Sequence, residues 1–482
     1  MYDILIIGAG VIGCAVAQRL STYAGRFAVL DRAHDVSEGA SKANSGIVHA
    51  GYDAKAGTEK ARLNVKGARM MRPYCQALGV PYGQPGALVL GFEEEDRATL
   101  QGLYENSLKN GVEGCRLIER DEVLKLEPHV NPAVLLALDV PASGLVSPYE
   151  LTHALADAAK ENGVDFLLGE TAQELSNQDG VWTVRCGKGT YTARAVINCA
   201  GAQGGELHNQ ISTRKVSIIP RRGQYYLLDH TAPLLFNRTI FQAPTKMGKG
   251  VLVSPTTHGN LLLGPTAEDI DDGLDTATTR DGLRDVLDKA RLTYPGINLR
   301  QVITTFSGIR AHEAGGDFII GKVEGAPAGA YEAIGIESPG LTAAPAIGEE
   351  LGDWVAYFLR LDKNLNYIPP TPLPKSFNAM NASERRAAYE MDPDYGRIVC
   401  RCEQVTEAEV RRAIRRGVGA TSLDGVKRRT RAGMGRCQGG FCSTRVMEIL
   451  AEELGKDMKD ITKLGGGSWV LDSDINQEAR HE

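Results

Sequence analysis

The chain has 482 residues, of which 43% are hydrophobic and 24% are charged, and its formal net charge is -6. At roughly 150 residues per domain, this composition favours a globular protein of two or three domains, and the modest negative charge gives no reason to expect a nucleic acid as partner. The N-terminus lacks a cationic leader, and no stretch reaches the apolar length of a spanning helix, so we expect neither secretion nor membrane insertion.

The first predicted elements form a dinucleotide-binding motif. Residues 4–7 predict a buried parallel strand, and Gly8-Ala9-Gly10-Val11-Ile12-Gly13 follows it and opens a helix. A second apolar strand at residues 27–30 ends at Asp31, near the spacing of about 20 residues typical of a carboxylate that binds ribose hydroxyls. Gly10 lets the backbone approach a pyrophosphate, and Gly13 lets the helix pack on the strand. The alternative, a purely structural glycine turn, is disfavoured because strand, glycines, helix, strand and acid occur in order.

The motif alone does not separate FAD from NAD, but the loop at residues 39–52 does. It consists of small and polar residues, including Asn44-Ser45-Gly46-Ile47-Val48-His49-Ala50-Gly51, whose bare backbone and short hydroxyls suit a flat ring. Here the chain resembles the FAD-dependent oxidoreductases of the D-amino-acid oxidase and glycerol-3-phosphate dehydrogenase superfamily. The resemblance returns at residues 195–201 and 334–342, so the FAD domain is expected to be assembled from separated segments.

The resemblance implies which residues hold the cofactor. In the last of these segments a helix is expected to begin near Thr342, where its N-terminus would stabilise negative charge on the reduced flavin ring. The predicted FAD-binding residues are Gly8, Gly10, Gly13, Asp31, Ser41, Asn44, Ser45, Gly46, Ala200, Gly201, Gly308, Gly335, Gly340, Leu341 and Thr342.

Between these segments the chain is rich in strand patterns. Residues 223–228, 251–256 and 261–266 read as strands, and residues 258–260, His-Gly-Asn, read as a hairpin turn between the last two. In the superfamily that the chain resembles, an antiparallel sheet of this kind covers the flavin. We therefore expect it to shape the substrate pocket.

Arg310, in the segment Phe306-Ser307-Gly308-Ile309-Arg310-Ala311, resembles the family arginine that holds the anionic group of the substrate. A guanidinium suits a carboxylate or a phosphate, although an ordinary structural ion pair is the alternative. His49 is our candidate for the group that accepts the hydroxyl proton. His312 is a weaker one, and a structural histidine is at least as good an interpretation of either. Arg221 and Arg222 are further candidates for the anion, or else a solvated pair.

Near the C-terminus, Cys400 and Cys402 form C-x-C, and Cys437 and Cys442 form C-x-x-x-x-C. The pattern resembles the [2Fe-2S] domain of the bacterioferritin-associated-ferredoxin type, and implies these four thiolates as cluster ligands. Structural zinc is the alternative, but zinc usually shows C-x-x-C knuckles.

Thr406 with Glu409 predicts a capped helix start, and a second helix is expected from Ser443. Many arginines in this module predict either charge balance for the cluster or docking of an acidic partner.

The predicted fold class is α/β: a discontinuous Rossmann-like FAD-binding domain, an antiparallel-sheet substrate domain and a small helical iron–sulfur module. We expect residues 472–482 to fray. The expected boundaries are 1–85, 140–210 and 305–365 for the FAD-binding domain, 86–139 and 211–304 for the substrate domain, 366–394 for a proline-rich linker, 395–455 for the [2Fe-2S] domain and 456–482 for a tail.

Within the superfamily, residues 44–51, residues 258–266 and the cysteine module together most resemble the catalytic subunit of anaerobic-type glycerol-3-phosphate dehydrogenases. The resemblance implies oxidation of a small anionic substrate, glycerol 3-phosphate, with electrons passing to a partner subunit or a quinone, in the cytoplasm or at the inner face of the membrane. An L-2-hydroxyglutarate dehydrogenase or oxidase is the nearest alternative. An electron-transfer subunit without its own substrate and a zinc-stabilised interaction protein also stay open, since fold does not fix function.

Overall fold

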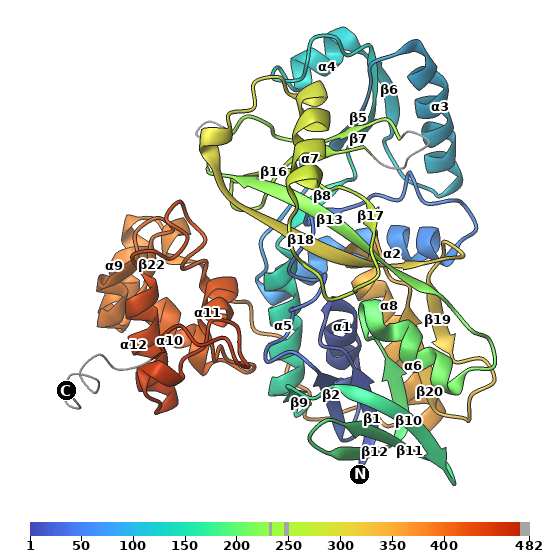
Figure 1. The fold of residues 1–482 in the computed structure, drawn as a ribbon, viewed down its shortest axis with the longest axis vertical. Coiled ribbons are helices and arrows are strands. Elements are labelled where there is room, and N and C mark those ends of the chain that lie inside the picture. Colours follow the sequence, from blue (N-terminus) through green and yellow to red (C-terminus); the bar gives the residue numbers. More distant parts are fainter. Residues whose placement is uncertain (231–233, 245–249, 473–482) are drawn as a thin grey trace.

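A computed structural model of the chain describes residues 1–230, 234–244 and 250–472. Two sheets and their helices form one large body, and a smaller helical module lies beside it (Figure 1). The predicted α/β class with a helical C-terminal module is confirmed. None of the described helices is long and apolar enough to cross a membrane. The prediction that residues 472–482 fray concerns, apart from Asp472, residues that lie outside the described part of the chain.

The first sheet carries the dinucleotide motif, and the predicted buried strands are its centre. β1 pairs in parallel with β2 on one side and with β12 on the other, and β12 also pairs in parallel with β20. Strands this apolar need cover on both faces, because a parallel sheet is buried on both sides. The strands are β1 (Tyr2–Ile7), β2 (Phe27–Asp31), β9 (Asp165–Leu168), β10 (Ala172–Gln178), β11 (Val181–Cys186), β12 (Thr190–Asn198), β19 (Ile319–Lys322) and β20 (Ala330–Ile334).

Helices from distant parts of the chain pack together over this sheet. α1 contacts both α5 and α8, and α8 also contacts α2. Small residues permit the close approach of two of them, since a Cβ on Gly348 would lie 2.8 Å from the backbone of Ala15. These helices are α1 (Val11–Leu20), α2 (Glu59–Leu78), α5 (Pro148–Glu161) and α8 (Gly340–Leu359), whereas α6 (Gly204–Ile211) contacts β10 and β12 and belongs to another core cluster.

The second sheet is mainly antiparallel, as expected for the substrate region. Its longest pair joins β13 to β18, and β15 and β16 form the predicted hairpin around residues 258–260. Its strands are β5 (Ala87–Gly91), β6 (Arg116–Glu119), β7 (Leu136–Val140), β13 (Ile218–Leu228), β14 (Thr239–Gln242), β15 (Leu252–Pro255), β16 (Leu261–Gly264), β17 (Glu268–Asp269) and β18 (Val302–Glu313).

Three helices flank this sheet, and a third, small sheet joins the body near the cavity described below. The helices are α3 (Glu94–Lys109), α4 (Arg120–Leu126) and α7 (Arg280–Thr293), and the small sheet consists of β3 (Ile47–Val48), β4 (Tyr82–Gly83) and β8 (Gly144–Val146).

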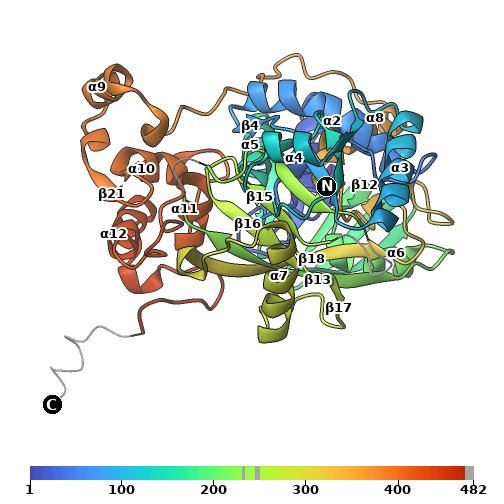
Figure 2. The ribbon, with the colours of Figure 1, turned by 90° about the horizontal axis from the view of Figure 1, so that it is seen from above.

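The module has its own apolar core, built from residues such as Val410, Val446 and Ile449. Thr406 accepts a hydrogen bond from the Glu409 N–H and completes the predicted capping box. The linker runs across the body to α9 at the outer edge (Figure 2). The elements are α9 (Ala382–Met391), β21 (Ile398–Cys400), β22 (Val405–Thr406), α10 (Glu407–Arg415), α11 (Leu423–Thr430) and α12 (Ser443–Leu454).

Candidate active site

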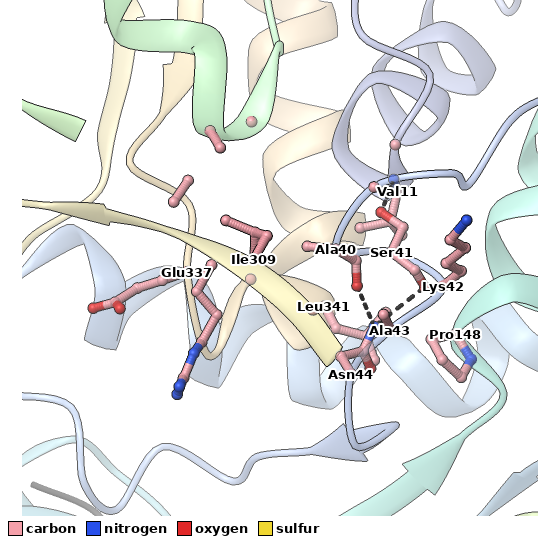
Figure 3. A pocket seen from close by; sticks show the side chains of 18 of the residues that line it. Val11, Ala40, Ser41, Lys42, Ala43, Asn44, Pro148, Ile309, Glu337 and Leu341 are labelled. Carbon is pink, nitrogen blue, oxygen red and sulfur yellow. Dashed lines mark hydrogen bonds between the residues drawn. The ribbon is translucent and has the colours of Figure 1, made fainter. Parts of the chain in front are cut away.

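A deep cavity of about 1870 Å³ opens where the two sheets and the module meet. Pockets for small ligands usually have about 300–1,000 Å³, so this one has room for a dinucleotide together with a substrate. The start of α1, the loop 39–46 and the start of α8 line it, and β13 and β18 of the second sheet line another wall. Figure 3 shows the loop residues Ala40 to Asn44 close to Val11, with Leu341 and Ile309 nearby.

The glycine turn leaves the first turn of α1 bare. Gly8 has φ +111°, and a Cβ there would lie 2.3 Å from the Cys199 carbonyl oxygen. A Cβ on Gly13 would lie 1.9 Å from the Gly8 carbonyl oxygen, so the predicted packing role of Gly13 is confirmed. Gly8 and Gly10 line the cavity. Apart from that of Val11, which donates to Ser41 Oγ, backbone N–H groups at the start of α1 are therefore open to an anion in the cavity.

Asp31 stands at the end of β2 and holds the turn. Its two carboxylate oxygens accept hydrogen bonds from the Ala9 N–H (2.6 Å) and the Ala33 N–H (2.8 Å). Burial raises its pKa, and these N–H groups oppose that rise. Asp31 also lines the cavity, next to Arg32 and Ala33. Its placement suits the predicted contact with ribose, because carboxylate oxygens have further lone pairs to accept bonds.

The loop 39–46 is fixed to α1 and to itself. Ser41 Oγ accepts from the Val11 N–H at 2.8 Å. Asn44 donates to the Ala40 carbonyl (2.9 Å) and accepts from the Gly46 N–H (2.8 Å). Strand β18 presses against this loop, since a Cβ on Gly308 would lie 2.0 Å from the Ala43 carbonyl oxygen. The loop therefore presents backbone and small side chains as one wall of the cavity.

His49 lies behind this loop and is buried, with 7% of its surface exposed. Its N–H donates to Thr342 Oγ1 at 2.9 Å, which ties the loop to α8. The ring nitrogen Nε2 lies 3.4 Å from Ser338 Oγ, and the ring is 5.8 Å from that of Phe241. The sequence did not single out Ser338 or Phe241, because nothing in their local pattern marks them. Folding places both beside a histidine that lines the cavity.

Arg310, on β18, lines the same cavity as His49. Its Nη2 donates to the Thr266 carbonyl oxygen at 2.5 Å, which uses one of the five donors of a guanidinium. The ring of Tyr225 stacks on that of Phe306 (4.8 Å) beside it on β13 and β18. Arg310 is thus held by a backbone carbonyl, and its remaining donors are available to an anion.

The other predicted cations are engaged elsewhere. Arg221 lines the cavity but forms an ion pair with Asp269 at 2.5 Å. Arg222 is buried, pairs with Glu268 and Asp275, and does not line the cavity, so it is neither a solvated residue nor a ligand of that space. His312 pairs with Glu337 (3.2 Å) and lies outside the lining as well.

Folding brings most of the predicted FAD-binding residues into one lining and leaves three outside it. Gly13, Gly335 and Thr342 do not line the cavity, although Gly13 and Thr342 support residues that do. Those that line it are Gly8, Gly10, Asp31, Ser41, Asn44, Ser45, Gly46, Ala200, Gly201, Gly308, Gly340 and Leu341.

The four cysteines of the module lie in two pairs. Cys402 Sγ is 3.8 Å from Cys437 Sγ, and the Cys400 thiol is hydrogen-bonded to that of Cys442. Across the described residues, no three His, Cys, Asp or Glu side chains gather closely enough to hold a single metal ion. Two pairs match a [2Fe-2S] cluster, in which four cysteines serve two irons.

Backbone N–H groups point at these sulfurs. Hydrogen bonds from the Cys442 thiol and from the Gly433 and Glu403 N–H groups lower the pKa of the Cys400 thiol to about 6. Burial of this thiol acts in the opposite direction and would raise its pKa. Burial alone would raise the pKa of Cys437, but N–H groups of Phe441 and Gly439 bring it below its usual value. Thiolates are the form that binds iron, so these N–H groups favour the ligating state of Cys400 and Cys437, whereas neighbouring thiols and burial raise the pKa of Cys402 and Cys442.

The family comparisons agree with this geometry. Residues 3–354 match the family model described as FAD dependent oxidoreductase. The chain belongs to the FAD-dependent oxidoreductase family. Residues 398–452 match the BFD-like [2Fe-2S] binding domain. The cofactors of this oxidoreductase are FAD and a [2Fe-2S] cluster.

Individual relatives extend the likeness of this oxidoreductase over its whole length. It is 44% identical over 481 residues, 100% of both chains, to a protein of Caloramator mitchellensis described as glycerol 3-phosphate dehydrogenase. It is 34% identical over 360 residues, 72% of this chain and 93% of the relative, to a glycerol 3-phosphate oxidase of Mycoplasma pneumoniae. The FAD-bound structure of L-alpha-glycerophosphate oxidase from Mycoplasma pneumoniae superposes with a TM-score of 0.73 at 32% identity, over 78% of this chain and 99% of that one.

The residues of the oxidoreductase cavity fit FAD. Both glycines allow a tight turn beside the cavity, because a Cβ on Gly8 would lie 2.3 Å from the Cys199 carbonyl oxygen and one on Gly10 would lie 3.1 Å from Ser41 Oγ. The start of α1 offers N–H groups other than that of Val11 for a pyrophosphate, and the residues of the loop 39–46, small and neutral apart from Lys42, offer a wall for a flat ring. Asp31, Ala200 and Gly201 line the part of the cavity next to β2 and β12, where the adenosine would lie in a fold of this type.

Most arginines of the module pair within the oxidoreductase chain. Arg411 and Arg415 bind Glu453 inside the module. Arg416 reaches Asp157 on α5, and Arg431 donates to Tyr149 (3.2 Å) and Asn260 (3.1 Å) of the large body. These side chains therefore stabilise the module and hold it on the large body. They are already paired within the chain and do not depend on an outside partner.

Proposed function

We propose that this oxidoreductase oxidises glycerol 3-phosphate to dihydroxyacetone phosphate and passes the electrons from FAD to its [2Fe-2S] cluster. The observation that carries the proposal is one cavity shared by three features. The cavity is lined by Arg310, by His49, and by Met434 and Gln438 of the module. The last two belong to the loop 431–442 between α11 and α12, which contains Cys437 and Cys442 and which we call the cluster loop. The full-length similarity to a protein described as a glycerol 3-phosphate dehydrogenase supports the choice of substrate.

Arg310 would bind the phosphate of the substrate. The bond to the Thr266 carbonyl fixes one edge of the guanidinium, so the other donors can face the cavity without further ordering. A guanidinium keeps its charge at every working pH. Holding the anion in one place would position the reacting carbon, which is how binding groups accelerate a reaction that they do not perform.

His49 would accept the proton of the substrate hydroxyl at Nε2. Ser338 Oγ, 3.4 Å from this nitrogen, would accept a hydrogen bond from the N–H that forms when Nε2 takes the proton, and Thr342 fixes the backbone beneath the ring. FAD supplies the hydride acceptor when it is bound. The N-terminus of α8, at Gly340 and Leu341, faces the cavity, and its dipole would favour the negative charge that accompanies reduction.

The cluster loop offers a short exit for electrons. Gln438 lines the cavity and is the neighbour of Cys437, which ligates the cluster in this proposal. On the outer side, Cys402 is exposed, and the ring of Phe441 is 90% exposed. We propose that a partner subunit or a quinone takes the electrons on this side, with the enzyme in the cytoplasm or at the inner face of the membrane. Co-purification of activity with a membrane fraction would distinguish these locations.

An anaerobic visible spectrum before and after addition of glycerol 3-phosphate tests the proposal. Bleaching of the flavin band, followed by reduction of the cluster bands, is the expected result. A flavin spectrum unchanged by glycerol 3-phosphate but bleached by L-2-hydroxyglutarate would replace the phosphate with a carboxylate as the group on Arg310. No bleaching by either would favour a subunit that only carries electrons.

A further inference from the structure

One loop of the FAD cavity is held by the iron–sulfur module. The loop, residues 32–42, leaves Asp31 and leads to Ser41, which binds the start of α1. Within it, Asp35 accepts two hydrogen bonds from Arg429 of α11, each 2.7 Å long. Arg428 donates to Asp35 at 3.1 Å and also pairs with Glu38. We call these contacts of Asp35 and Glu38 with Arg428 and Arg429 the loop clamp.

The loop clamp is buried and rigid. The side chains of Arg429 and Asp35 are 0% and 5% exposed. Arg429 also donates to the Gly425 and Val418 carbonyl oxygens of its own module, at 3.0 and 2.7 Å. The planar guanidinium of Arg429 is therefore bound both to its own module and to Asp35, so the position of the module fixes the position of the loop.

The loop has a shape that needs such support. Ser37 has φ +67°, a left-handed conformation that costs a residue with a side chain about 1–2 kcal/mol. Its N–H donates to the Ala9 carbonyl at 3.0 Å, inside the glycine turn. Asp35 of the loop clamp is therefore only two residues from Ser37, whose hydrogen bond reaches the turn on which a pyrophosphate would rest.

The module also contributes to the wall of the cavity itself. Lys427, Arg428 and Leu464 line it beside Glu38 and Lys42. The backbone of the segment after η5 (Met458–Asp460) covers the loop, because a Cβ on Gly465 would lie 2.3 Å from the Cβ of His34.

We propose that the iron–sulfur module is part of the FAD-binding site: through the loop clamp it holds the loop that closes on the cofactor, so module docking and FAD binding strengthen each other. Undocking would free the loop. It would also leave Glu38, whose side chain lines the cavity, paired only with Lys42 among the described residues, so that its carboxylate faces the site of an anionic pyrophosphate. Like charges this close repel in a partly buried site. Arg428 and Arg429 are thus positioning residues for FAD.

The first test measures FAD binding rather than turnover. Full-length apoprotein carrying Arg428→Gln is titrated with FAD, and the quenching of flavin fluorescence gives the dissociation constant. Coupling between sites typically amounts to about 5- to 150-fold, and we expect a weakening in that range. The matched control is Arg415→Gln, an arginine of the same module that is 65% exposed and pairs with Glu453 inside it. Equal FAD affinity of the two variants would overturn the proposal.

A double variant separates the loop clamp from general damage. If Arg428 acts through Glu38, the variant Arg428→Gln with Glu38→Gln binds FAD no more weakly than Arg428→Gln alone, since coupled residues are not additive. Fully multiplicative losses would contradict the loop clamp. The visible spectrum of the cluster reports whether the module is folded, and an FAD loss seen only in preparations without cluster would overturn the proposal too.

Linkage gives a reciprocal readout, because FAD must favour docking by the same factor by which docking favours FAD. We expect FAD to slow proteolytic cleavage of residues 366–376, the part of the predicted linker that precedes α9, in the native chain and to protect it much less in Arg428→Gln. Identical cleavage rates with and without FAD in the native chain would refute the link. This test needs no substrate, so it stands apart from the assignment of glycerol 3-phosphate.

Discussion

In the FAD cavity, residues that act together come from distant parts of the chain, whereas the four cluster cysteines come from one contiguous stretch. His49 lies beside Ser338, and β18 presses on the loop before His49. Cys400 to Cys442, in contrast, lie in a module with its own core. The comparison teaches that the module can carry its ligands as a unit, while the cavity exists only when the whole body has folded. Changes at the cluster ligands or at the side chains that bind substrate should therefore alter one half of the electron path, whereas changes in the loop clamp should affect both.

The largest effect is expected from a change that breaks the path between the two regions. Cys437→Ser removes a predicted ligand on the cavity side of the cluster, beside Gln438. We expect the cluster absorption and its paramagnetic signal to disappear and electron delivery to an external one-electron acceptor to be lost. Flavin bleaching by substrate under anaerobic conditions should persist. If bleaching is lost together with the cluster, the two regions are not separable.

Arg310→Ala should damage only the cavity. Loss of a guanidinium that pairs with a substrate anion typically costs about 2–5 kcal/mol, and we expect kcat/KM for flavin reduction to fall accordingly. Rapid-mixing absorbance measures this rate, and the cluster spectrum and FAD content serve as controls. Arg310→Lys should recover part of the loss. Unchanged reduction by every anionic substrate would remove Arg310 from the site.

His49→Asn tests the proton acceptor. General-base catalysis contributes about 10²- to 10⁴-fold, so the rate of flavin reduction should fall within that range while FAD stays bound. The native enzyme should also lose rate as pH falls, because a protonated imidazole cannot accept the hydroxyl proton, and the variant should lack this dependence. A variant with the native pH profile would assign the proton to another group.

The contact between the two regions should be sensitive to acid through His153. This histidine lies on α5 under the module, with Nε2 3.9 Å from Asp35, and burial together with the nearby Arg429 lowers its pKa to about 3. Because the unfolded chain binds this proton near pH 6.5 and the folded chain does not, stability falls as pH drops from 6.5 towards 3, by about 1.4 kcal/mol per pH unit. His153→Gln should flatten the dependence of the melting temperature on pH over that window, and an equally steep curve would exclude His153 as its source.

Ser338→Ala should have the smallest effect. A single hydrogen bond of this kind contributes about 0.5–1.5 kcal/mol, so the rate of flavin reduction should fall roughly two- to tenfold. The KM for substrate should change little if Ser338 only stabilises protonated His49. A loss as large as that of His49→Asn would instead place Ser338 in direct contact with the reacting hydroxyl.

Local patterns in the sequence carried the fold class and many elements. The glycine turn, the strand before it and the acid after it could be predicted because each is a property of neighbouring residues. The same holds for the capping box at Thr406 and for the cysteine spacing. Arg310 was found through a family resemblance and His49 through its place directly after the predicted flavin loop, and the structure lines one cavity with both.

Other features had no local signature. Arg222 was expected either at the surface or at the substrate, yet it is buried in pairs with Glu268 and Asp275. Ser338 and Phe241 meet His49 only across three elements. The role of the module arginines depends on carboxylates such as Asp35 and Asp157, hundreds of residues away. No pattern along the chain reports which of many possible charge pairs will form.

The amino-acid sequence by itself determined the two kinds of cofactor, since FAD and a thiolate-bound cluster each require short motifs of fixed chemistry and spacing. Only the tertiary structure decided how those cofactor sites meet. It placed Gln438 of the module in the FAD cavity and seated Arg429 on Asp35. The physical reason is that motifs fix backbone geometry over a few residues, whereas contacts between distant segments depend on how helices and sheets pack as whole surfaces.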